Sequence, residues 1–338
     1  MMRARTLWNL ARTATLRRAV NVVRITAAQL VSATLHRPVV WGMPWTLTIE
    51  PTNRCNLACP ECPSGNGSLV RPLGSMTLER FRRLVDEVSP HVFYLQLYFQ
   101  GEPFINKSLA EMVAHAHRRR MYTAISTNAH FLRAETARAL LDAGLDRLIV
   151  SVDGTSEESY QTYRVGGTFA AVLRGLDALA AERRVHARGK RLELVVQFLV
   201  TRQNEHEIDS VRKLAAAYDA SLALKTMQVY SVESAEAFLP RDERYRRYLV
   251  RDGELVMKGR MANRCARLWD RSVITWDGVV VPCCFDKNAE HAVGSLDDGA
   301  FEEVWTGEAL QGFRARVLSD RRGVPMCTNC TEGLRVYR

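Results

Sequence analysis

Acidic residues are missing from the first 49 positions of this 338-residue chain, which carry seven arginines and no Asp or Glu. The formal charge of the whole chain is +10, so the remainder accounts for only about +3 (+10 minus +7). A basic excess confined to one end does not favour a protein that binds nucleic acid over its whole surface. We therefore expect no nucleic-acid partner.

Long uncharged apolar runs are also missing, because Arg24 and Gln29 interrupt the most apolar stretch, residues 19–35. The sequence therefore predicts no signal peptide, no membrane span and a cytoplasmic location. Six apolar residues between positions 16 and 31 recur at helical spacing: Leu16, Val20, Val23, Ala27, Leu30 and Val31. Four polar residues fall on the other side of such a helix: Arg17, Asn21, Arg24 and Ser32. We interpret this pattern as an amphipathic helix whose apolar stripe packs on the following domain. The alternative is that residues 1–36 contact an anionic membrane or an acidic partner.

Cysteine is missing between positions 62 and 265, so the eight cysteines fall into two groups: Cys55, Cys59 and Cys62, then Cys265, Cys283, Cys284, Cys327 and Cys330. Disulfides are not expected without an export signal, because the cytosol keeps thiols reduced. Clustered cysteines in such a protein are more often metal ligands. The wide gap predicts two separate sites.

Strand-like runs alternate with helix-like stretches through residues 45–230. The six predicted strands are Trp45–Glu50, Tyr94–Phe99, Thr123–Ser126, Leu148–Val152, Leu192–Val200 and Leu222–Val229. Predicted helices lie between them, near residues 77–88, 107–119, 134–143, 168–183 and 206–218. Parallel strands need crossover helices, so this order predicts an α/β fold with a partial (β/α)6 barrel, and leaves an open doubly wound sheet as the alternative.

The composition changes after residue 230. Residues 1–44 form an N-terminal extension, residues 231–262 a polar linker, and residues 263–338 a small domain. In that domain Asp277-Gly278 separates two apolar runs, which predicts a β-hairpin, and a helix is predicted over residues 299–318.

The first cysteine group has the spacing CxxxCxxC and directly follows the first predicted strand. Three thiolates on one loop can bind three irons of a [4Fe–4S] cluster and leave the fourth iron open. A structural zinc site usually has four protein ligands, and the next histidine along the chain is His91. The spacing therefore favours an iron–sulfur cluster over zinc.

This loop resembles that of the radical S-adenosylmethionine superfamily, and the resemblance covers roughly residues 45–230. It implies that Gly101 and Glu102, in Gln-Gly-Glu-Pro, bind the amino group of the methionine moiety. It also implies cofactor contacts at the ends of the third and fourth strands and at an arginine beyond them: Ser126, Asn128, Ser151, Asp153 and Arg164. Glu61, before the third cysteine, departs from the aromatic residue that the superfamily often has there.

The resemblance implies a reaction as well as a fold. S-adenosylmethionine would be cleaved reductively to a 5′-deoxyadenosyl radical, which removes a hydrogen atom from a substrate C–H bond. A flavodoxin or ferredoxin-type protein would supply the electron.

The second cysteine group resembles the SPASM/twitch extension of that superfamily. Cys265, Cys283, Cys327 and Cys330 are expected to bind one auxiliary [4Fe–4S] cluster for electron transfer, although by spacing alone the same pairs fit a zinc ribbon. Cys284 is then surplus. It is a buried small residue, a substitute ligand, or a thiol that returns a hydrogen atom to the substrate.

The sequence therefore predicts a radical S-adenosylmethionine enzyme with two [4Fe–4S] clusters and an unidentified substrate. Oxidation or epimerisation of a sugar-like metabolite and modification of a peptide all fit. The hypothesis from another class is a non-catalytic zinc or iron–sulfur scaffold docked at a membrane surface.

Overall fold

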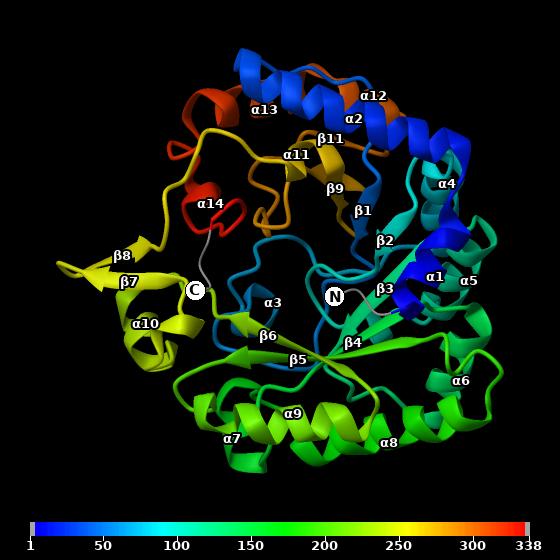
Figure 1. Ribbon diagram of the computed structural model, residues 1–338, viewed down its shortest axis with the longest axis vertical. Helices are drawn as coiled ribbons and strands as arrows, with labels where there is room; N and C mark the ends of the chain where they lie inside the picture. Colours follow the sequence, from blue (N-terminus) through cyan, green and yellow to red (C-terminus); the bar gives the residue numbers. More distant parts are fainter. Residues whose placement is uncertain (1–3, 335–338) are drawn as a thin grey trace.

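Six parallel strands follow one another in chain order across the sheet of the computed structural model, which describes residues 4–334 (Figure 1). They are β1 Thr46–Ile49, β2 Tyr94–Gln96, β3 Tyr122–Thr127, β4 Arg147–Ser151, β5 Glu193–Val200 and β6 Ser221–Thr226. Every residue of β1 is buried, as expected for a parallel strand that is covered on both faces. All six predicted strands are confirmed.

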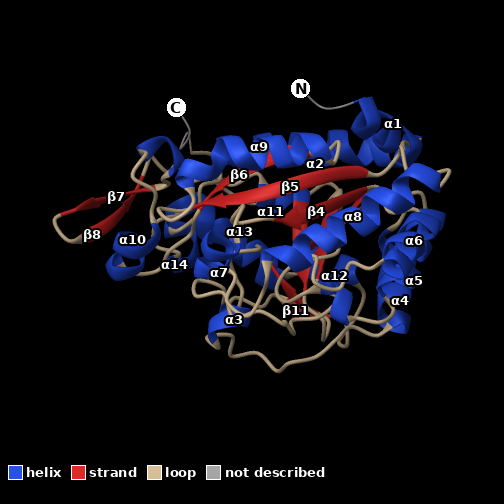
Figure 2. Ribbon diagram, turned by 90° about the horizontal axis from the view of Figure 1, so that it is seen from below, coloured by secondary structure: helices blue, strands red, loops and turns tan. Residues whose placement is uncertain are grey.

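Helices connect consecutive strands along the outside of the curved sheet (Figures 1 and 2). The five crossover helices are α4 Leu78–Val88, α5 Leu109–Arg118, α6 Ala134–Ala143, α8 Phe169–Val185 and α9 Ile208–Ala217. Thr77 caps α4 and Thr168 caps α8, because each hydroxyl accepts a hydrogen bond from a backbone N–H of the first turn. The predicted incomplete barrel is confirmed, and it is an α/β structure.

The C-terminal segment extends this sheet. Strand β9 (Arg271–Ile274) pairs parallel with β1, and β10 (Val279–Val281) and β11 (Gly294–Ser295) follow antiparallel beyond it. The predicted hairpin is therefore present, and it lies in the same sheet as the barrel strands. Four helices complete the segment: α11 Arg267–Asp270, α12 Phe301–Thr306, α13 Glu308–Asp320 and α14 Pro325–Thr328. The single helix expected over 299–318 is thus two helices that meet at Gly307.

Residues 231–262 contain more regular structure than the sequence analysis assigned. Helix α10 (Val232–Phe238) is followed by a separate hairpin of β7 (Tyr248–Arg251) and β8 (Glu254–Met257), which projects from the molecule (Figure 1). Its turn is Asp252-Gly253, with positive φ at both residues. Asp-Gly between apolar runs is a hairpin signal that could have identified it. Short helices α3 (Pro63–Asn66) and α7 (Glu157–Tyr163) and 3₁₀ turns at Pro103–Ile105, Glu205–Glu207 and Glu243–Tyr245 complete the elements.

Two helices form the N-terminal extension, α1 (Ala4–Thr13) and α2 (Leu16–Leu35). Helix α1 covers the amino ends of the barrel strands, where Arg12 contacts both carboxylate oxygens of Asp146 at 2.9 and 3.0 Å. Helix α2 lies beside α11, and the segment after it accepts hydrogen bonds from two buried tryptophans, Trp269 to Val39 O and Trp305 to Gly42 O. The extension therefore packs on the domains that follow it.

The predicted orientation of α2 is wrong. Its inward face carries Arg18, Asn21, Ile25, Ala28 and Ser32, whereas four of the apolar residues expected to face inward are exposed: Leu16, Val20, Val23 and Leu30. The reason is that the neighbouring helices α4 and α5 end against α2. The buried Arg18 guanidinium donates to Ser89 O, Arg119 O and Arg120 O, which are carbonyls at those helix ends. Such carbonyls need donors when they are buried, so a polar face is selected.

The main core fills the space between the sheet and the crossover helices, with Phe81, Met112, Leu148 and Phe198 fully buried in it. A smaller apolar cluster surrounds the first cysteine loop and includes Tyr163, Val229 and Tyr248. Among the described helices, none is both long enough and apolar enough to cross a membrane.

Candidate functional site

The loop after β1 brings the first three cysteines to one cavity at the carboxyl ends of the barrel strands. The cavity has a free volume of about 110 Å³ and is lined by three thiols together with polar groups from β2, β3, β4 and the segment after α7: Cys55, Leu57, Cys59, Cys62, Gly65, Gly101, Glu102, Ser126, Thr127, Asn128, Ser151 and Arg164. Active sites of barrels collect at this end of the strands. The structure thus groups nine of the residues that the sequence nominated, and adds Leu57, Gly65 and Thr127.

Two glycines allow the loops of this cavity to approach closely. Gly101 has φ +75°, and a Cβ atom there would lie 2.6 Å from the carbonyl oxygens of Thr52 and Arg54. A Cβ on Gly65 would lie 2.5 Å from the backbone nitrogen of Cys59. Any side chain at either position would therefore push the cysteine loop away from its neighbours.

Glu102 is a buried carboxylate that three groups of the chain hold in place. It accepts hydrogen bonds from Thr127 Oγ1 at 2.7 Å, Asn128 N at 2.8 Å and Phe104 N at 3.2 Å. Burial raises its pKa to about 7, and these hydrogen bonds act in the opposite direction. A cationic or hydrogen-bond-donating ligand in the cavity would restore the ionised form.

Arg164 and Asp153 form an ion pair at the edge of this cavity. Arg164 Nε lies 2.6 Å from Asp153 Oδ2, and Asp153 Oδ1 accepts from the backbone nitrogen of Leu199 at 2.7 Å. Arg164 lines the cavity and points Nη1 at the sulfur of Cys59, 3.8 Å away, whereas Asp153 lies behind the arginine. Of the residues predicted to contact the cofactor, Asp153 is the one that does not line the cavity, and it pairs with Arg164 instead.

Glu61 occupies the position before the third cysteine, where the superfamily often has an aromatic residue, and it does not line the cavity. Its carboxylate accepts a hydrogen bond from Ser234 Oγ of α10 at 2.6 Å. On the other side, Asn128 Nδ2 donates to Asn56 Oδ1 at 2.8 Å. Both contacts fix the cysteine loop against the barrel.

The second group of thiols meets around a much smaller space. Cys265, Cys283, Cys327 and Cys330 surround a free volume of about 10 Å³, and the rest of the lining is mostly apolar: Leu268, Phe285, Phe313, Val317, Arg321 and Met326. Cys265 precedes α11, Cys283 follows β10, and the terminal pair lies at α14. All four cysteines that the sequence nominated are brought together here.

Cys284 points elsewhere. It does not line the four-thiol space, and its sulfur lies 3.6 Å from Arg267 Nη1. A hydrogen bond from Cys283 lowers the pKa of Cys284, and Arg267 and Arg271 act in the same direction. The thiol is therefore in a cationic setting that differs from the apolar setting of the four others.

Both groups fit an iron–sulfur cluster. Burial raises the pKa of Cys59 and of Cys265 to about 11, so thiolates at these positions require a compensating positive charge such as iron supplies. In the part of the chain that the structure describes, no three His, Cys, Asp or Glu side chains lie close enough together to hold a single metal ion.

A buried ion pair connects the two sites. Glu50, at the end of β1, binds both terminal nitrogens of Arg71 at 2.7 and 2.9 Å, and it also accepts from the backbone nitrogen of Trp276 in the C-terminal hairpin at 3.1 Å. Arg71 Nε donates to the carbonyl of Lys287 at 2.8 Å. The loop that follows Cys283 and Cys284 is therefore tied to the strand that precedes Cys55.

Two models of known protein families match separate regions of the chain. A model of the Radical SAM superfamily matches residues 49–215, and a model of the SPASM iron–sulfur cluster-binding domain matches residues 265–331. PqqA peptide cyclase of Rhodopseudomonas palustris is 29% identical over 302 residues, which cover 81% of this chain and 77% of the relative. Mycofactocin maturase MftC of Mycobacterium ulcerans is 27% identical over 309 residues, which cover 85% and 80%.

Solved structures share the fold. Streptococcus suis SuiB bound to S-adenosylmethionine superposes with a TM-score of 0.60 at 14% identity, covering 85% of this chain and 71% of SuiB. BtrN in complex with AdoMet and 2-DOIA superposes with a TM-score of 0.54 at 18% identity, covering 86% and 94%.

Proposed function

Because the chain belongs to the radical S-adenosylmethionine superfamily and carries a SPASM domain, we propose that it modifies a peptide at an unactivated C–H bond. The chain is an enzyme that uses S-adenosylmethionine and iron–sulfur clusters. The alternative hypothesis of a non-catalytic scaffold is therefore rejected. The names of two relatives, PqqA peptide cyclase and mycofactocin maturase, support a peptide substrate. The observation that carries the proposal is the cavity in which three thiols face Glu102, Asn128 and Arg164.

In this proposal Cys55, Cys59 and Cys62 bind one [4Fe–4S] cluster and leave one iron free for S-adenosylmethionine. When bound, the cofactor and its cluster supply the one-electron chemistry that removes a hydrogen atom from the substrate. Glu102 accepts a hydrogen bond from the amino group of the methionine moiety. The serines and Asn128 at the strand ends position the ribose and the carboxylate, and Asp153 acts through Arg164 by fixing its guanidinium.

Cys265, Cys283, Cys327 and Cys330 bind the auxiliary [4Fe–4S] cluster in the same proposal. All four thiols are used, so this cluster has no iron free for a ligand, and its role is electron transfer. We assign the external electron donor to the flavodoxin or ferredoxin type. The cytoplasm is the proposed location, because the eight cysteines are free thiols and the cytosol keeps thiols reduced.

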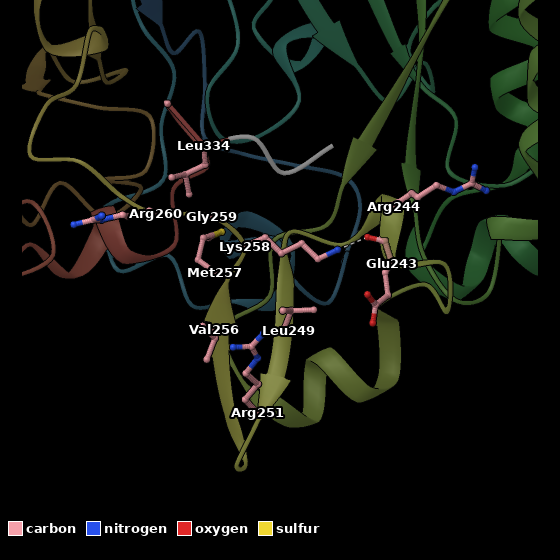
Figure 3. Close-up of a pocket in the computed structure, with 11 residues that line it drawn as sticks. Glu243, Arg244, Leu249, Arg251, Val256, Met257, Lys258, Gly259, Arg260 and Leu334 are labelled. Atoms are coloured by element: carbon pink, nitrogen blue, oxygen red, sulfur yellow. Dashed lines mark hydrogen bonds between the residues drawn. The ribbon is translucent and has the colours of Figure 1, made fainter. Parts of the chain in front are cut away.

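The projecting hairpin is the proposed place for the peptide. A hollow of about 830 Å³ lies beside β7 and β8, and four cationic side chains and one carboxylate, Glu243, from the hairpin and its flanks line it: Arg244, Arg251, Lys258 and Arg260 (Figure 3). Within residues 4–334, β7 and β8 pair with each other and with no other strand, so in that part of the chain each has an edge to which an extended peptide can add. Met257 lines the hollow and also packs on the apolar cluster that contains Cys59, which links the hollow to the cofactor cavity.

Anaerobically purified protein tests the proposal. With S-adenosylmethionine and a reductant it should form 5′-deoxyadenosine, and with its peptide the product should show a changed mass. The candidate peptide is one encoded beside the gene. Lys258→Glu with Arg260→Glu should weaken peptide binding and leave 5′-deoxyadenosine formation without peptide unchanged. Turnover of a small sugar-like metabolite, with no effect of the two substitutions, would contradict the peptide assignment.

A further inference from the structure

The outward face of α2 is apolar and has no partner among the residues that the structure describes. Leu16, Val23 and Leu30 are 82%, 68% and 62% exposed, and Val20 lies between them on the same face. Isolated exposed apolar residues are ordinary, but a row of them at helical spacing marks an interaction surface. We call this row the α2 stripe: Leu16, Val20, Val23 and Leu30.

Helix α2 cannot bury the stripe by rotating, because its opposite face is fixed by specific contacts. Asn21 binds the backbone of Met43 twice, through Nδ2 to the carbonyl at 2.8 Å and through Oδ1 from the amide at 2.9 Å. Ser32 accepts from the amide of Val39 at 2.8 Å. With Arg18 holding the ends of α4 and α5, these contacts set the outward direction of the stripe.

Exposed arginines flank the stripe, and one of them, Arg17, donates a hydrogen bond to His91 Nε2 at 3.3 Å. Arg17, Arg24 and Arg37 are exposed, and within residues 4–334 none of them forms an ion pair with a carboxylate. The nearest acid in sequence is Glu50. The surface around the stripe is therefore positively charged as well as apolar.

A hollow of about 670 Å³ runs along one side of the stripe. Leu16, Val20 and Trp41 form apolar walls, Arg17 and Arg24 line it with guanidinium donors, and His91, whose Nε2 accepts from Arg17, and one carboxylate, Glu302, complete the polar lining. Trp41 is 50% exposed. Tryptophan at the boundary of an apolar and a charged surface is typical of proteins that rest in a membrane interface.

We propose that the α2 stripe docks on the surface of an anionic phospholipid bilayer. The apolar side chains enter the boundary between headgroups and acyl chains, Trp41 lies at headgroup level, and Arg17 and Arg24 bind lipid phosphates beside the hollow. Charge complementarity selects this occupant, since a neutral apolar partner would leave three arginines without anions. Helix α2, which carries the stripe, lies at the outer edge of the molecule, away from α8 and α9 (Figure 1).

Vesicle flotation of the full-length protein with its clusters tests the proposal. The protein should float with vesicles of phosphatidylglycerol and phosphatidylcholine in equal parts, float less in high salt, and stay in solution with pure phosphatidylcholine. Val23→Asp with Arg24→Glu should weaken partitioning about 30-fold, since each basic residue near an anionic surface contributes and one is here reversed.

The matched control is Val185→Asp with Arg184→Glu, because Val185 is 76% exposed and both residues lie at the end of α8, outside the α2 stripe and the hollow beside it. This control should float like the parent. Both double variants replace exposed side chains, so each should keep its iron and its circular dichroism spectrum. Failure of the parent to float, or equal flotation of both variants, would overturn the proposal. So would a parent dimer that only the α2 variant dissociates, because the stripe would then be an interface between two copies. Neither result bears on 5′-deoxyadenosine formation, which tests the proposed function separately.

Discussion

The two thiol sites differ in what surrounds the sulfur atoms. The three-thiol cavity has a free volume of about 110 Å³ and polar walls that include Glu102, Asn128 and Arg164. The four-thiol space has about 10 Å³ and mostly apolar walls, among them Leu268 and Phe313. A site that must bind a charged ligand needs room and hydrogen-bond partners, whereas a site that only holds a cluster needs a complete ligand set and the exclusion of water.

The two sites also differ in how the chain builds them. Cys55, Cys59 and Cys62 lie on one loop, so their proximity is largely local. The other four thiols come from segments before α11, after β10 and at α14, so they meet only if the C-terminal sheet and helices are folded. The first site therefore depends on its loop, and the second depends on the domain.

The largest expected effect comes from removing the three-thiol site. Replacing Cys55, Cys59 and Cys62 by Ala should abolish formation of 5′-deoxyadenosine and lower the iron content from about eight to about four per chain, because each [4Fe–4S] cluster holds four irons. Iron analysis and chromatography of the reaction products measure both. If the triple variant still cleaved S-adenosylmethionine, the division of roles between the two sites would be wrong.

Removing the four-thiol site should lower the iron content without stopping cleavage of S-adenosylmethionine. Cys327→Ser with Cys330→Ser should also leave about four irons, yet cleavage of S-adenosylmethionine without substrate should continue while product formation stops. Cys284→Ala is the control, and we expect it to keep about eight irons because Cys284 does not line the space. A loss of one cluster in Cys284→Ala would make it a ligand. A content of four irons and one zinc in the parent protein would show that the second site holds zinc.

The link between the sites can be broken at Glu50. Glu50→Gln leaves the buried Arg71 guanidinium without its carboxylate, and we expect the free energy of unfolding to fall by about 3–5 kcal/mol. Urea unfolding measures this. The double variant Glu50→Gln with Arg71→Met should lose less than the sum of the single variants, because neither charge is then left unpaired.

Arg138→Met provides the comparison for that experiment. Arg138 pairs with Glu182 at 3.0 Å on the surface, with a side chain that is 63% exposed, so its loss should lower the free energy of unfolding by less than about 1 kcal/mol. Equal losses from Glu50→Gln and Arg138→Met would mean that the buried pair does not hold the two sites together.

The last prediction concerns pH and distinguishes the polar cavity from the apolar space. Burial raises the pKa of Glu102 to about 7, and only the ionised carboxylate is a full hydrogen-bond acceptor. The affinity of the parent protein for S-adenosylmethionine should therefore fall as the pH is lowered through about 7. The affinity of Glu102→Gln should not depend on pH, and above pH 7 it should be about 30-fold weaker than that of the parent. Equilibrium dialysis measures this. Glu61→Gln, which changes a carboxylate outside the cavity, should keep the pH dependence of the parent.

Much of this arrangement was predictable from the sequence, and the exceptions are informative. Strand–helix alternation predicted the barrel because buried parallel strands and crossover helices have different periodicities. The β7–β8 hairpin carried a recognisable Asp-Gly turn that the polar composition of residues 231–262 obscured. Asp153 carried no such signal, because only the fold places Arg164 against it.

The sequence by itself determined the chemistry of this protein and the order of its elements, since thiol spacing and hydrophobic periodicity are properties of the local chain. The tertiary structure alone decided that β9 joins the sheet beside β1, that Asp153 lies behind Arg164, and that α2 turns its apolar stripe outward. The pairing of β9 with β1 and the orientation of α2 depend on partners far away in the chain, whereas Asp153 and Arg164 are 11 residues apart and meet through the fold of the segment after β4. Arg18 faces inward because the ends of α4 and α5 place buried carbonyl groups there, and carbonyls that need donors outweigh the burial of four apolar side chains.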